Sequence, residues 1–348
     1  MILHLTRKEK FTKPFISFVK NNFNIKNNFF LLIGGNQDKN FDLEDTNYIK
    51  TLNTKYDFFM YFIEFNKKMY LSDKIIIHGL SQPYSIIYLF FNPWLLKKTY
   101  WMIWGADLYS YKLSKRTVKW NILEFFKRYI IKHMGYITTT IPGDYLLAKE
   151  WYSTDAIYIQ NLMYQSHVSR NVKEINKNSH NSINIQVGNC SDKSHNHIEI
   201  LNILLKYKNE NIKIFLPLSY GDENYAKKII YEGNKLFGDK FIPITDFMSF
   251  EKYNDYMSSI DIAIFNYDRQ QAMGNIIGLI SLGKKVYLKS TITPYKYFLD
   301  LGIKVYSLSN DVEINKISKK DASENKEIAK SFFSSNTLKN NWKDILSD

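Results

Sequence analysis

The feature that most constrains this chain is an alternation of strand-like and helix-like segments, which occurs twice. In the first half, apolar runs of strand length lie at residues 2–5, 29–33, 56–61, 74–77, 99–104 and 136–140. Their β-branched and aromatic residues favour strands, and segments of helical character separate them, among them 83–91 and 115–132. Such alternation predicts parallel strands joined by crossover helices, because parallel neighbours need a long connection.

The same pattern restarts after a polar stretch rich in Gln, Ser, His, Asn and Lys. Strands are expected at 183–187, 212–216, 241–244, 260–265, 285–288 and 304–306, and helices at 195–207, 223–236, 250–258 and 271–282. We therefore predict an α/β fold of two Rossmann-like domains with parallel sheets facing a cleft. The first domain spans 1–164 and the second 183–320, with a linker at 165–182 and a polar, helical tail at 321–348.

Length and composition exclude several other classes of protein. At 348 residues the chain can form two domains that each bury a core. Cys190 is the only cysteine, so no internal disulfide can form, and a cytoplasmic setting is expected. The apolar run Tyr84–Leu96 is broken by Asn92-Pro93 and is shorter than the roughly 20 residues that span a bilayer. Charges begin at Arg7, so no signal peptide is expected.

Positive charge is concentrated in one aromatic-rich segment. The net charge of the chain is +13. Residues 97–135 carry nine basic and two acidic side chains, and nine minus two gives +7: Lys97, Lys98, Lys112, Lys115, Arg116, Lys119, Lys127, Arg128 and Lys132 against Asp107 and Glu124. Apolar residues recur at helical spacing within the segment, flanked by lysines, at Val118, Ile122, Phe125 and Tyr129. A basic, aromatic segment suits an anionic membrane surface or a nucleic acid, and it is also compatible with a merely solvated face.

Two loops of the second half carry the residue types of a diphosphate site. The strand 183–187 is followed by a loop with Gly188, Asn189 and Asp192 before a helix. A glycine and small polar residues ahead of a helix can aim backbone N–H groups at an anion. The loop is neither a Walker loop nor a Gly-x-Gly-x-x-Gly fingerprint.

The second loop places one arginine and two amides at a helix start, with Arg269, Gln270 and Gln271 followed by Gly274. It suits the same diphosphate, although such a segment is also compatible with a capping turn that carries a surface arginine. Position alone places Tyr220 beside the sugar of such a ligand and Thr245 beside its base.

Four segments in register carry a resemblance to a known family. The segment Trp104-Gly105-Ala106-Asp107-Leu108-Tyr109 resembles one in the dTDP-N-acetylfucosamine:lipid II N-acetylfucosaminyltransferases, a family that makes bacterial surface polysaccharide. Three further matches follow the order of the family: His78-Gly79, then Val187-Gly188-Asn189 with Asp192 and His197-Ile198, then Arg269-Gln270-Gln271 with Gly274. Cys190-Ser191 stands where the family has Ser-Gly.

The resemblance implies the glycosyltransferase B fold, in which a C-terminal helix packs back across the domain boundary. It also implies a metal-independent, inverting transferase without a cofactor. The donor would be dTDP-N-acetylfucosamine and the acceptor an undecaprenyl-diphosphate-linked saccharide. Such an enzyme would be peripheral to the cytoplasmic face of the bacterial inner membrane and would bind no nucleic acid.

Displacement at a sugar carbon needs a base that takes the proton of the acceptor hydroxyl. Asp107 is the first candidate, because it follows a strand-like run that ends at Gly105 and has aromatic neighbours. An isolated Gly-x-Asp is also typical of a solvated turn with a capping aspartate. Glu9, after the first strand, is the second candidate, and the resembled family has an acid near that position. His78 is the third, although it could instead orient a carboxylate.

Other chemistries lack their signatures in this sequence. No Asp-x-Asp triplet occurs, and His195 and His197 are two residues apart, where helical side chains diverge. No Gly-x-Ser-x-Gly elbow of a hydrolase is present. Two alternatives remain: a nucleotide-sugar epimerase of the same fold class, which would not need the basic surface, and a basic protein that binds nucleic acid or membranes, for which no nucleic-acid motif is visible.

Overall fold

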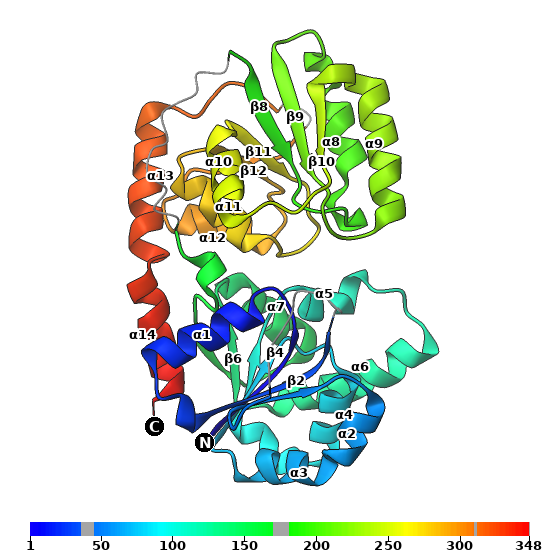
Figure 1. Cartoon of the computed structure of the whole chain (residues 1–348), viewed down its shortest axis with the longest axis vertical. Helices are drawn as coiled ribbons and strands as arrows, with labels where there is room; N and C mark the ends of the chain where they lie inside the picture. The colour runs from blue at the N-terminus through cyan, green and yellow to red at the C-terminus, as the bar shows by residue number, and fades with distance from the viewer. Residues whose placement is uncertain (36–44, 170–180, 310–311, 348) are drawn as a thin grey trace. The chain divides into compact units, whose positions relative to one another are not determined.

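The protein consists of two compact units, which the computed structural model describes over residues 1–35, 45–169, 181–309 and 312–347 (Figure 1). Unit 1 contains Met1–Ser166 and Ser335–Asp348, and unit 2 contains His167–Ser334. Each unit has its own parallel sheet and its own buried apolar cluster. The predicted α/β class with two parallel sheets is thereby confirmed. Most of the expected linker at 165–182 lies outside the described residues.

Unit 1 is built on seven parallel strands in the order β3-β2-β1-β4-β5-β6-β7. The strands are β1 (Ile2–Lys8), β2 (Asn28–Gly35), β3 (Ile49–Leu52), β4 (Lys74–His78), β5 (Thr99–Met102), β6 (Tyr136–Thr139) and β7 (Ile157–Gln160). The central strands are almost continuously apolar and buried, as expected for a parallel sheet covered on both faces. On one side of the β1/β4 boundary the strands follow one another outward as β1, β2 and β3, and on the other side as β4 to β7. This boundary, at which the order of the strands reverses, is the switch point of the sheet.

Helices connect the strands of unit 1. They are α1 (Thr12–Asn22), α2 (Lys55–Met60), α3 (Phe62–Leu71), α4 (Pro83–Phe91), α5 (Ala106–Leu113), α6 (Val118–His133), α7 (Pro142–Tyr152) and α14 (Ser335–Leu346), with the short 3₁₀ turns η1 (Ile25–Asn27) and η2 (Pro93–Lys98). Pro83 and Pro142 occupy the first helical position of α4 and α7. Proline suits that position because its fixed φ is helical and its missing N–H would have no partner there.

The strand predicted at 56–61 is wrong, because residues Lys55–Met60 form helix α2. The aromatic composition of this stretch favoured a strand, but a capping box starts a helix. Thr54 Oγ1 accepts from the backbone N–H of Asp57, and the Asp57 carboxylate accepts from the backbone N–H of Thr54. These two local bonds satisfy helix donors that would otherwise lack partners.

Two short strands of unit 1 were not predicted, namely β3 and β7. Each has only four residues and occupies an edge of the sheet. Edge strands are exposed on one side and pair with one neighbour, so their apolar pattern is weak. Neither the length nor the apolar pattern of these two segments was therefore enough to predict a strand from the sequence.

Unit 2 has six parallel strands in the order β10-β9-β8-β11-β12-β13. They are β8 (Ile183–Val187), β9 (Ile212–Pro217), β10 (Phe241–Ile244), β11 (Ile262–Phe265), β12 (Lys285–Leu288) and β13 (Tyr306–Ser307). The helices are α8 (His197–Leu204), α9 (Glu223–Phe237), α10 (Phe250–Ser259), α11 (Met273–Ser281), α12 (Thr293–Asp300) and α13 (Lys319–Phe332), with 3₁₀ turns η4 (Lys193–His195), η5 (Leu205–Tyr207) and η6 (Gly238–Lys240). The switch point of this sheet lies between β8 and β11.

The tail of the chain forms two helices that belong to different units. Helix α13 packs in unit 2, where the Asn325 side chain bonds the backbone N–H and C=O of Lys304. Helix α14 packs in unit 1 beside α1 (Figure 1). The Trp342 indole N–H donates to the carbonyl of Met163 at 2.8 Å, and its ring lies 4.6 Å from that of Phe15 in α1. The end of the chain therefore closes the core of unit 1.

No helix in the described part of the chain is long and apolar enough to cross a membrane.

Candidate active site

The donor residues predicted in the second half gather at one edge of the unit 2 sheet. They follow β8, β9, β10 and β11, which are adjacent in the sheet, and they are Gly188, Asn189, Asp192, Tyr220, Thr245, Arg269, Gln270, Gln271 and Gly274. Carboxyl ends of parallel strands share an edge, and ligands of open α/β sheets bind outside that edge at the switch point. The loops after β8 and β11 flank the switch point.

The loop after β8 requires a glycine. Gly188 has a φ of +65°, in the left-handed region that side chains rarely adopt. A Cβ at this position would lie 2.5 Å from Nε2 of His197 and 3.0 Å from Nδ1 of His195. Both histidines are buried, and burial lowers their pKa to about 3 for His195 and about 4 for His197. The loop therefore turns over two neutral imidazoles at the start of α8.

Two tyrosines hold the carboxamide of Asn189. Its Nδ2 donates to the Tyr220 hydroxyl at 2.7 Å, and its Oδ1 accepts from the Tyr267 hydroxyl at 2.6 Å. Tyr267 is fully buried and lies two residues beyond β11, so it links the loops on either side of the switch point. Sequence reasoning missed Tyr267, because a tyrosine behind a strand carries no signal of its own. The three side chains make the β8 loop rigid.

The β8 and β9 loops are bonded directly to each other. The Ser191 N–H and hydroxyl both donate to the Tyr220 carbonyl, at 2.9 and 2.8 Å. A Cβ on Gly221 would lie 2.6 Å from Oγ of Ser191, so only glycine permits this approach. Asp192 begins the short turn η4 by accepting from the Ser194 N–H at 2.9 Å. Burial raises the pKa of Asp192, but the hydrogen bonds from Ser194 outweigh it, and the pKa is lowered overall.

The β11 loop brings a cation and amides toward the β8 loop. Arg269 lies in the loop after β11, which pairs with β8 in the sheet, and its positive charge adds a small contribution to the lowered pKa of Asp192 and of His195. Ser194 Oγ lies 3.5 Å from Oε1 of Gln271. Gln270 is buried, and its Oε1 has no partner among the described residues. Gly274 is the second residue of α11, whose start follows Ala272 in the left-handed conformation. A helix start, a guanidinium and an amide thus lie at one switch point.

An aromatic pair joins the β9 and β10 loops, with Tyr220 partly buried and Phe247 exposed. The ring of Phe247 stacks on that of Tyr220, with centroids 6.3 Å apart and planes 15° from parallel. Phe247 is 76% exposed, and Thr245 beside it is exposed as well. A flat, solvent-facing aromatic surface next to the β8 loop is suited to stacking against a planar ring such as a nucleobase.

In unit 1, the carboxylate of Asp107 is committed to three hydrogen bonds. Oδ2 accepts from the Trp101 indole at 2.6 Å and from the Leu80 N–H at 2.8 Å, and Oδ1 accepts from the Trp104 N–H at 3.0 Å. Asp107 is only 4% exposed. Its carboxylate therefore ties the loop after β4 to β5 and to the turn that starts α5, and both of its oxygens are occupied.

His78 belongs to a buried chain of hydrogen bonds whose direction is fixed at both ends. Asn28 Nδ2 donates to the Asn24 carbonyl, so Asn28 Oδ1 faces Nε2 of His4 at 3.0 Å and must accept. At the other end the Trp104 indole N–H, which can only donate, bonds the Tyr164 hydroxyl at 2.9 Å. Between them, Tyr164 donates to Nδ1 of His78 at 2.8 Å, and Nε2 of His78 donates to Nδ1 of His4 at 3.1 Å.

Both histidines of this chain are neutral. Burial lowers the pKa of His4 to about 4 and holds that of His78 well below its usual value, with His4 as a second cause. Because both ring nitrogens of His78 are engaged and its side chain is 2% exposed, the imidazole positions Tyr164 and Trp104.

Glu9 has the accessibility that Asp107 and His78 lack. It follows β1, the central strand beside the switch point, and is partly exposed. Burial raises its pKa above the usual value, while the charges of Arg7 and Lys10 oppose that rise. No described residue donates a hydrogen bond to its carboxylate. Phe11, two residues beyond Glu9, has its ring 4.8 Å from the rings of both Trp104 and Tyr164, so Glu9 lies near this end of the buried chain.

We predict that acid destabilises both units because of their buried histidines. In the unfolded chain a histidine binds a proton with a pKa of 6.5, but the native pKa is about 4 for His4 and His197. Stability is therefore complete above pH 6.5 and falls as the pH drops toward 4. At pH 5 each such histidine should cost about 2 kcal/mol relative to pH 8. Urea unfolding at these two pH values measures the loss.

The variant His197→Leu supplies the control for this pH dependence. Neither ring nitrogen of His197 has a hydrogen-bond partner among the described residues, so leucine removes the titration without leaving an unpaired group. Unit 2 of this variant should lose about 2 kcal/mol less between pH 8 and 5 than the wild type. An unchanged pH slope in the variant would mean that His197 is protonated as easily in the native as in the unfolded state.

Comparison with solved structures shows the fold. Anabaena Alr3699/HepE in complex with UDP aligns over 99% of both chains, with a TM-score of 0.70 and 10% identity. WaaG, a glycosyltransferase involved in lipopolysaccharide biosynthesis, aligns over 100% of both chains with a TM-score of 0.64 and 11% identity. A glycosyltransferase from Rickettsia africae aligns over 99% of this chain and 97% of its own, with a TM-score of 0.68 and 13% identity. The expected glycosyltransferase B fold is confirmed.

Family membership follows from the sequence as a whole. The pattern of the family described as 4-alpha-L-fucosyltransferase glycosyl transferase group 56 matches residues 18–348. The match includes both loops at the unit 2 switch point and the Trp104–Asp107 turn of unit 1. The chain therefore belongs to glycosyl transferase group 56, and it is a glycosyltransferase.

Proposed function

We propose that this glycosyltransferase transfers a deoxy-amino sugar, N-acetylfucosamine, from a dTDP-linked donor to an undecaprenyl-diphosphate-linked saccharide, with inversion at the sugar carbon. The reaction would serve bacterial surface polysaccharide synthesis at the cytoplasmic face of the inner membrane. The single observation that carries the proposal is the convergence of the family's motif residues on the switch point of unit 2. The epimerase alternative would use the same donor site, but it would leave the membrane surface described below without a role.

The donor would occupy the carboxyl edge of the unit 2 sheet. HepE, a fold neighbour, has been crystallised with UDP and with UDP-glucose, which supports a nucleotide-sugar donor here. The diphosphate would lie against the β8 loop and the start of α11, where Arg269 supplies positive charge. Charge on the departing diphosphate must be offset as the glycosidic bond breaks, and fixed cations and backbone dipoles do this without reorganisation. The nucleobase of the donor would stack on the Phe247–Tyr220 pair.

The acceptor would be activated in unit 1, and the geometry favours Glu9 over Asp107 as the base. A general base needs a lone pair that the substrate can reach. All described contacts of the Asp107 carboxylate are hydrogen bonds from neighbouring donors, whereas the Glu9 carboxylate is partly exposed and has none. Because its pKa is raised, the ionised Glu9 carboxylate is a stronger base than an ordinary glutamate, which suits removal of a hydroxyl proton near neutral pH. Asp107 would then act as a positioning residue for the loop after β4.

The acceptor lipid requires a surface that meets a membrane, and α6 supplies one. Its apolar stripe faces solvent, with Val118 77%, Ile122 55% and Phe125 64% exposed. Ring contacts join the stripe to α4, where Phe90 lies 5.1 Å from Tyr129 and 5.9 Å from Phe125. Exposed apolar patches of this kind mark interaction surfaces. Lys115 and Arg116, just before α6, and Lys119, in its first turn, are exposed and suit anionic headgroups.

Not every cation of the basic segment lies on that surface. Lys127 is buried, and its ammonium donates to the carbonyl of Asp107 and to Oγ of Ser110 at 3.1 Å. Arg128 donates to the Trp151 carbonyl at 2.9 Å, and Lys98 donates to the Tyr70 carbonyl at 2.8 Å. These three side chains stabilise unit 1, so the membrane surface is limited to the exposed cations.

We predict that Arg269→Ala weakens dTDP binding by roughly 1.5–3 kcal/mol, the range of a charge-assisted hydrogen bond. Calorimetric titration of dTDP, UDP and GDP measures the affinity and the base preference. Arg116→Ala is the matched control, because it removes an exposed guanidinium from unit 1 and should leave dTDP affinity unchanged. Equal affinity of the wild type and Arg269→Ala, with normal circular dichroism, would remove Arg269 from the donor site.

We predict that Glu9→Gln lowers turnover by roughly 10²–10⁴ with the donor affinity retained, because the amide cannot accept the proton. The wild-type rate should rise with pH through the pKa of Glu9, since only the ionised form is a base, and this limb should disappear in the variant. Asp107→Asn should instead lower the unfolding midpoint, because one oxygen acceptor becomes an NH₂ donor that faces N–H groups. Normal turnover of Glu9→Gln would return the role to Asp107 or His78.

We predict that reversing Lys115, Arg116 and Lys119 to glutamate releases the enzyme from anionic liposomes, and that activity on lipid-linked acceptor falls while dTDP affinity does not. High salt should have the same effect on the wild type, because exposed charges are screened beyond about 8–10 Å. Reversal of the exposed Lys227, Lys228 and Lys235 on α9 changes the net charge equally and should leave liposome binding intact. Equal sedimentation of the wild type and the first variant with liposomes would exclude this surface.

A further inference from the structure

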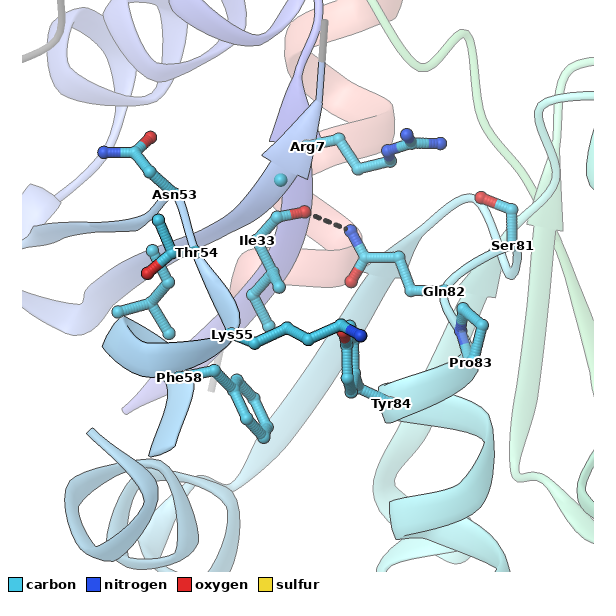
Figure 2. A pocket seen from close by; sticks show the side chains of 12 residues that line it. Arg7, Ile33, Asn53, Thr54, Lys55, Phe58, Ser81, Gln82, Pro83 and Tyr84 are labelled. Atoms are coloured by element: carbon cyan, nitrogen blue, oxygen red, sulfur yellow. Dashed lines mark hydrogen bonds between the residues drawn. The ribbon is translucent and has the colours of Figure 1, made fainter. Parts of the chain in front are cut away.

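A pocket of about 240 Å³ lies at the carboxyl edge of the unit 1 sheet, apart from all residues assigned above (Figure 2). Its walls come from the ends of four adjacent strands: Arg7 in β1, Ile33 and Gly34 in β2, the turn at Asn53 after β3, and Ser81–Tyr84 after β4. The pocket therefore spans the switch point between β1 and β4, where the loops of an open α/β sheet leave room for a ligand.

Among the described residues, two cations and no carboxylate line the pocket. Arg7 is partly buried and Lys55 is exposed. In Figure 2 both side chains extend toward the wall formed by Ser81–Tyr84. No salt bridge joins either cation to a carboxylate among the described residues. Unpaired positive charge at the walls of a concave site favours an anionic ligand, since low-dielectric walls concentrate the field.

The walls of the pocket are held by contacts of their own. Nε2 of Gln82 donates to the Ile33 carbonyl at 2.8 Å, which ties the β4 loop to β2. The capping box of Thr54 and Asp57 fixes the start of the helix that carries Lys55. The rings of Phe58 and Tyr84 stack with centroids 5.1 Å apart and join α2 to the start of α4. A ligand would therefore meet a preformed site.

The pocket connects the proposed base to an apolar surface. Arg7 and Glu9 are two residues apart at the carboxyl end of β1, and the charge of Arg7 opposes the rise in the pKa of Glu9 that burial causes. On the other side, α2, which begins at Lys55, and α3 expose large apolar side chains: Phe59 is 75%, Met60 64% and Ile63 80% exposed. An anion held by Arg7 and Lys55 would thus have the base on one side and an unpartnered apolar surface on the other.

We propose that this pocket binds the diphosphate of the lipid-linked acceptor, with the saccharide directed toward Glu9 and the polyprenyl chain leaving over α2 and α3. This inference rests on the proposed function, because it names the group by which the acceptor is held. Arg7 presents a planar guanidinium to one phosphate and Lys55 a point charge to the other. The apolar residues of α2 and α3 contact the first isoprene units and the membrane.

Binding of geranylgeranyl diphosphate in neutral detergent micelles tests the inference, followed by tryptophan fluorescence or calorimetry. Arg7→Gln and Lys55→Gln should each weaken binding about tenfold or more, because each removes a charged hydrogen bond. Lys149→Gln is the matched control: it removes an exposed lysine from α7, away from the pocket lining and from α2 and α3, and should bind like the wild type. Geranylgeraniol, which lacks the diphosphate, should bind at least tenfold more weakly than geranylgeranyl diphosphate.

The outcomes separate this inference from the proposed function. If the wild type turns over lipid-linked acceptor while Arg7→Gln and Lys55→Gln keep its KM and its affinity for the probe, the pocket inference is wrong and the function stands. Equal binding of geranylgeraniol would mean that the pocket recognises lipid, which also overturns it. Tight binding of inorganic pyrophosphate that geranylgeranyl diphosphate does not displace would assign the pocket to a free anion. Retained dTDP affinity of both variants shows that they are folded, so that a loss of probe binding reports on the pocket itself.

Discussion

Parallel strand pairing is the constraint on which the sites of this protein depend. Every strand in both sheets runs in the same direction as its neighbours, so each must be followed by a crossover, and the loops of one kind gather at one edge. At the point where the strand order reverses, adjacent crossovers leave on opposite faces and the loops separate. The diphosphate-type loops of unit 2 and the cationic pocket of unit 1 both lie at such points.

Two groups of buried polar side chains in unit 1, one around Asp107 and one around His78, are held by hydrogen bonds. The Asp107 carboxylate receives three N–H donors, and the Lys127 ammonium lies against the carbonyl of the same residue. The imidazoles of His4 and His78 remain neutral and so avoid the desolvation cost of a buried charge. Because their tautomers are fixed, every hydrogen bond of this buried chain is donated in the same direction, from Trp104 toward Asn28. The hydrogen bonds between its members make such a network rigid. Loss of one member leaves its buried partners without a hydrogen bond, which costs free energy of folding. Trp342 closes this network from α14, far along the chain.

The sequence around Asp107 suggested a catalytic carboxylate, but its contacts in the folded chain are those of a residue that positions a loop. The sequence places a carboxylate after a strand-like run, but it does not state whether that carboxylate faces a substrate or the protein. Leu80 and Trp101 are 27 and 6 residues away in sequence, and only the folded chain brings their N–H groups to the same oxygen. Glu9 has no such partners and remains accessible, although its sequence surroundings are less distinctive. For the same reason the apolar stripe of α6 could be read from its spacing, but its exposure to solvent could not.

The sequence by itself determined the alternation of strands and helices, the two parallel sheets and the loops that carry the family's motifs, because hydrophobic periodicity and glycine-bearing strand ends are local properties. Helix α2 was missed because a capping box of Thr54 and Asp57 outweighed a strand-like composition. Only the tertiary structure decided which polar groups are satisfied and which are open. It placed Lys127 inside, joined Asn189 to Tyr267 across a switch point, and set Arg7 and Lys55 around one pocket. Those relations depend on distances between residues remote in the chain, and no local pattern encodes them.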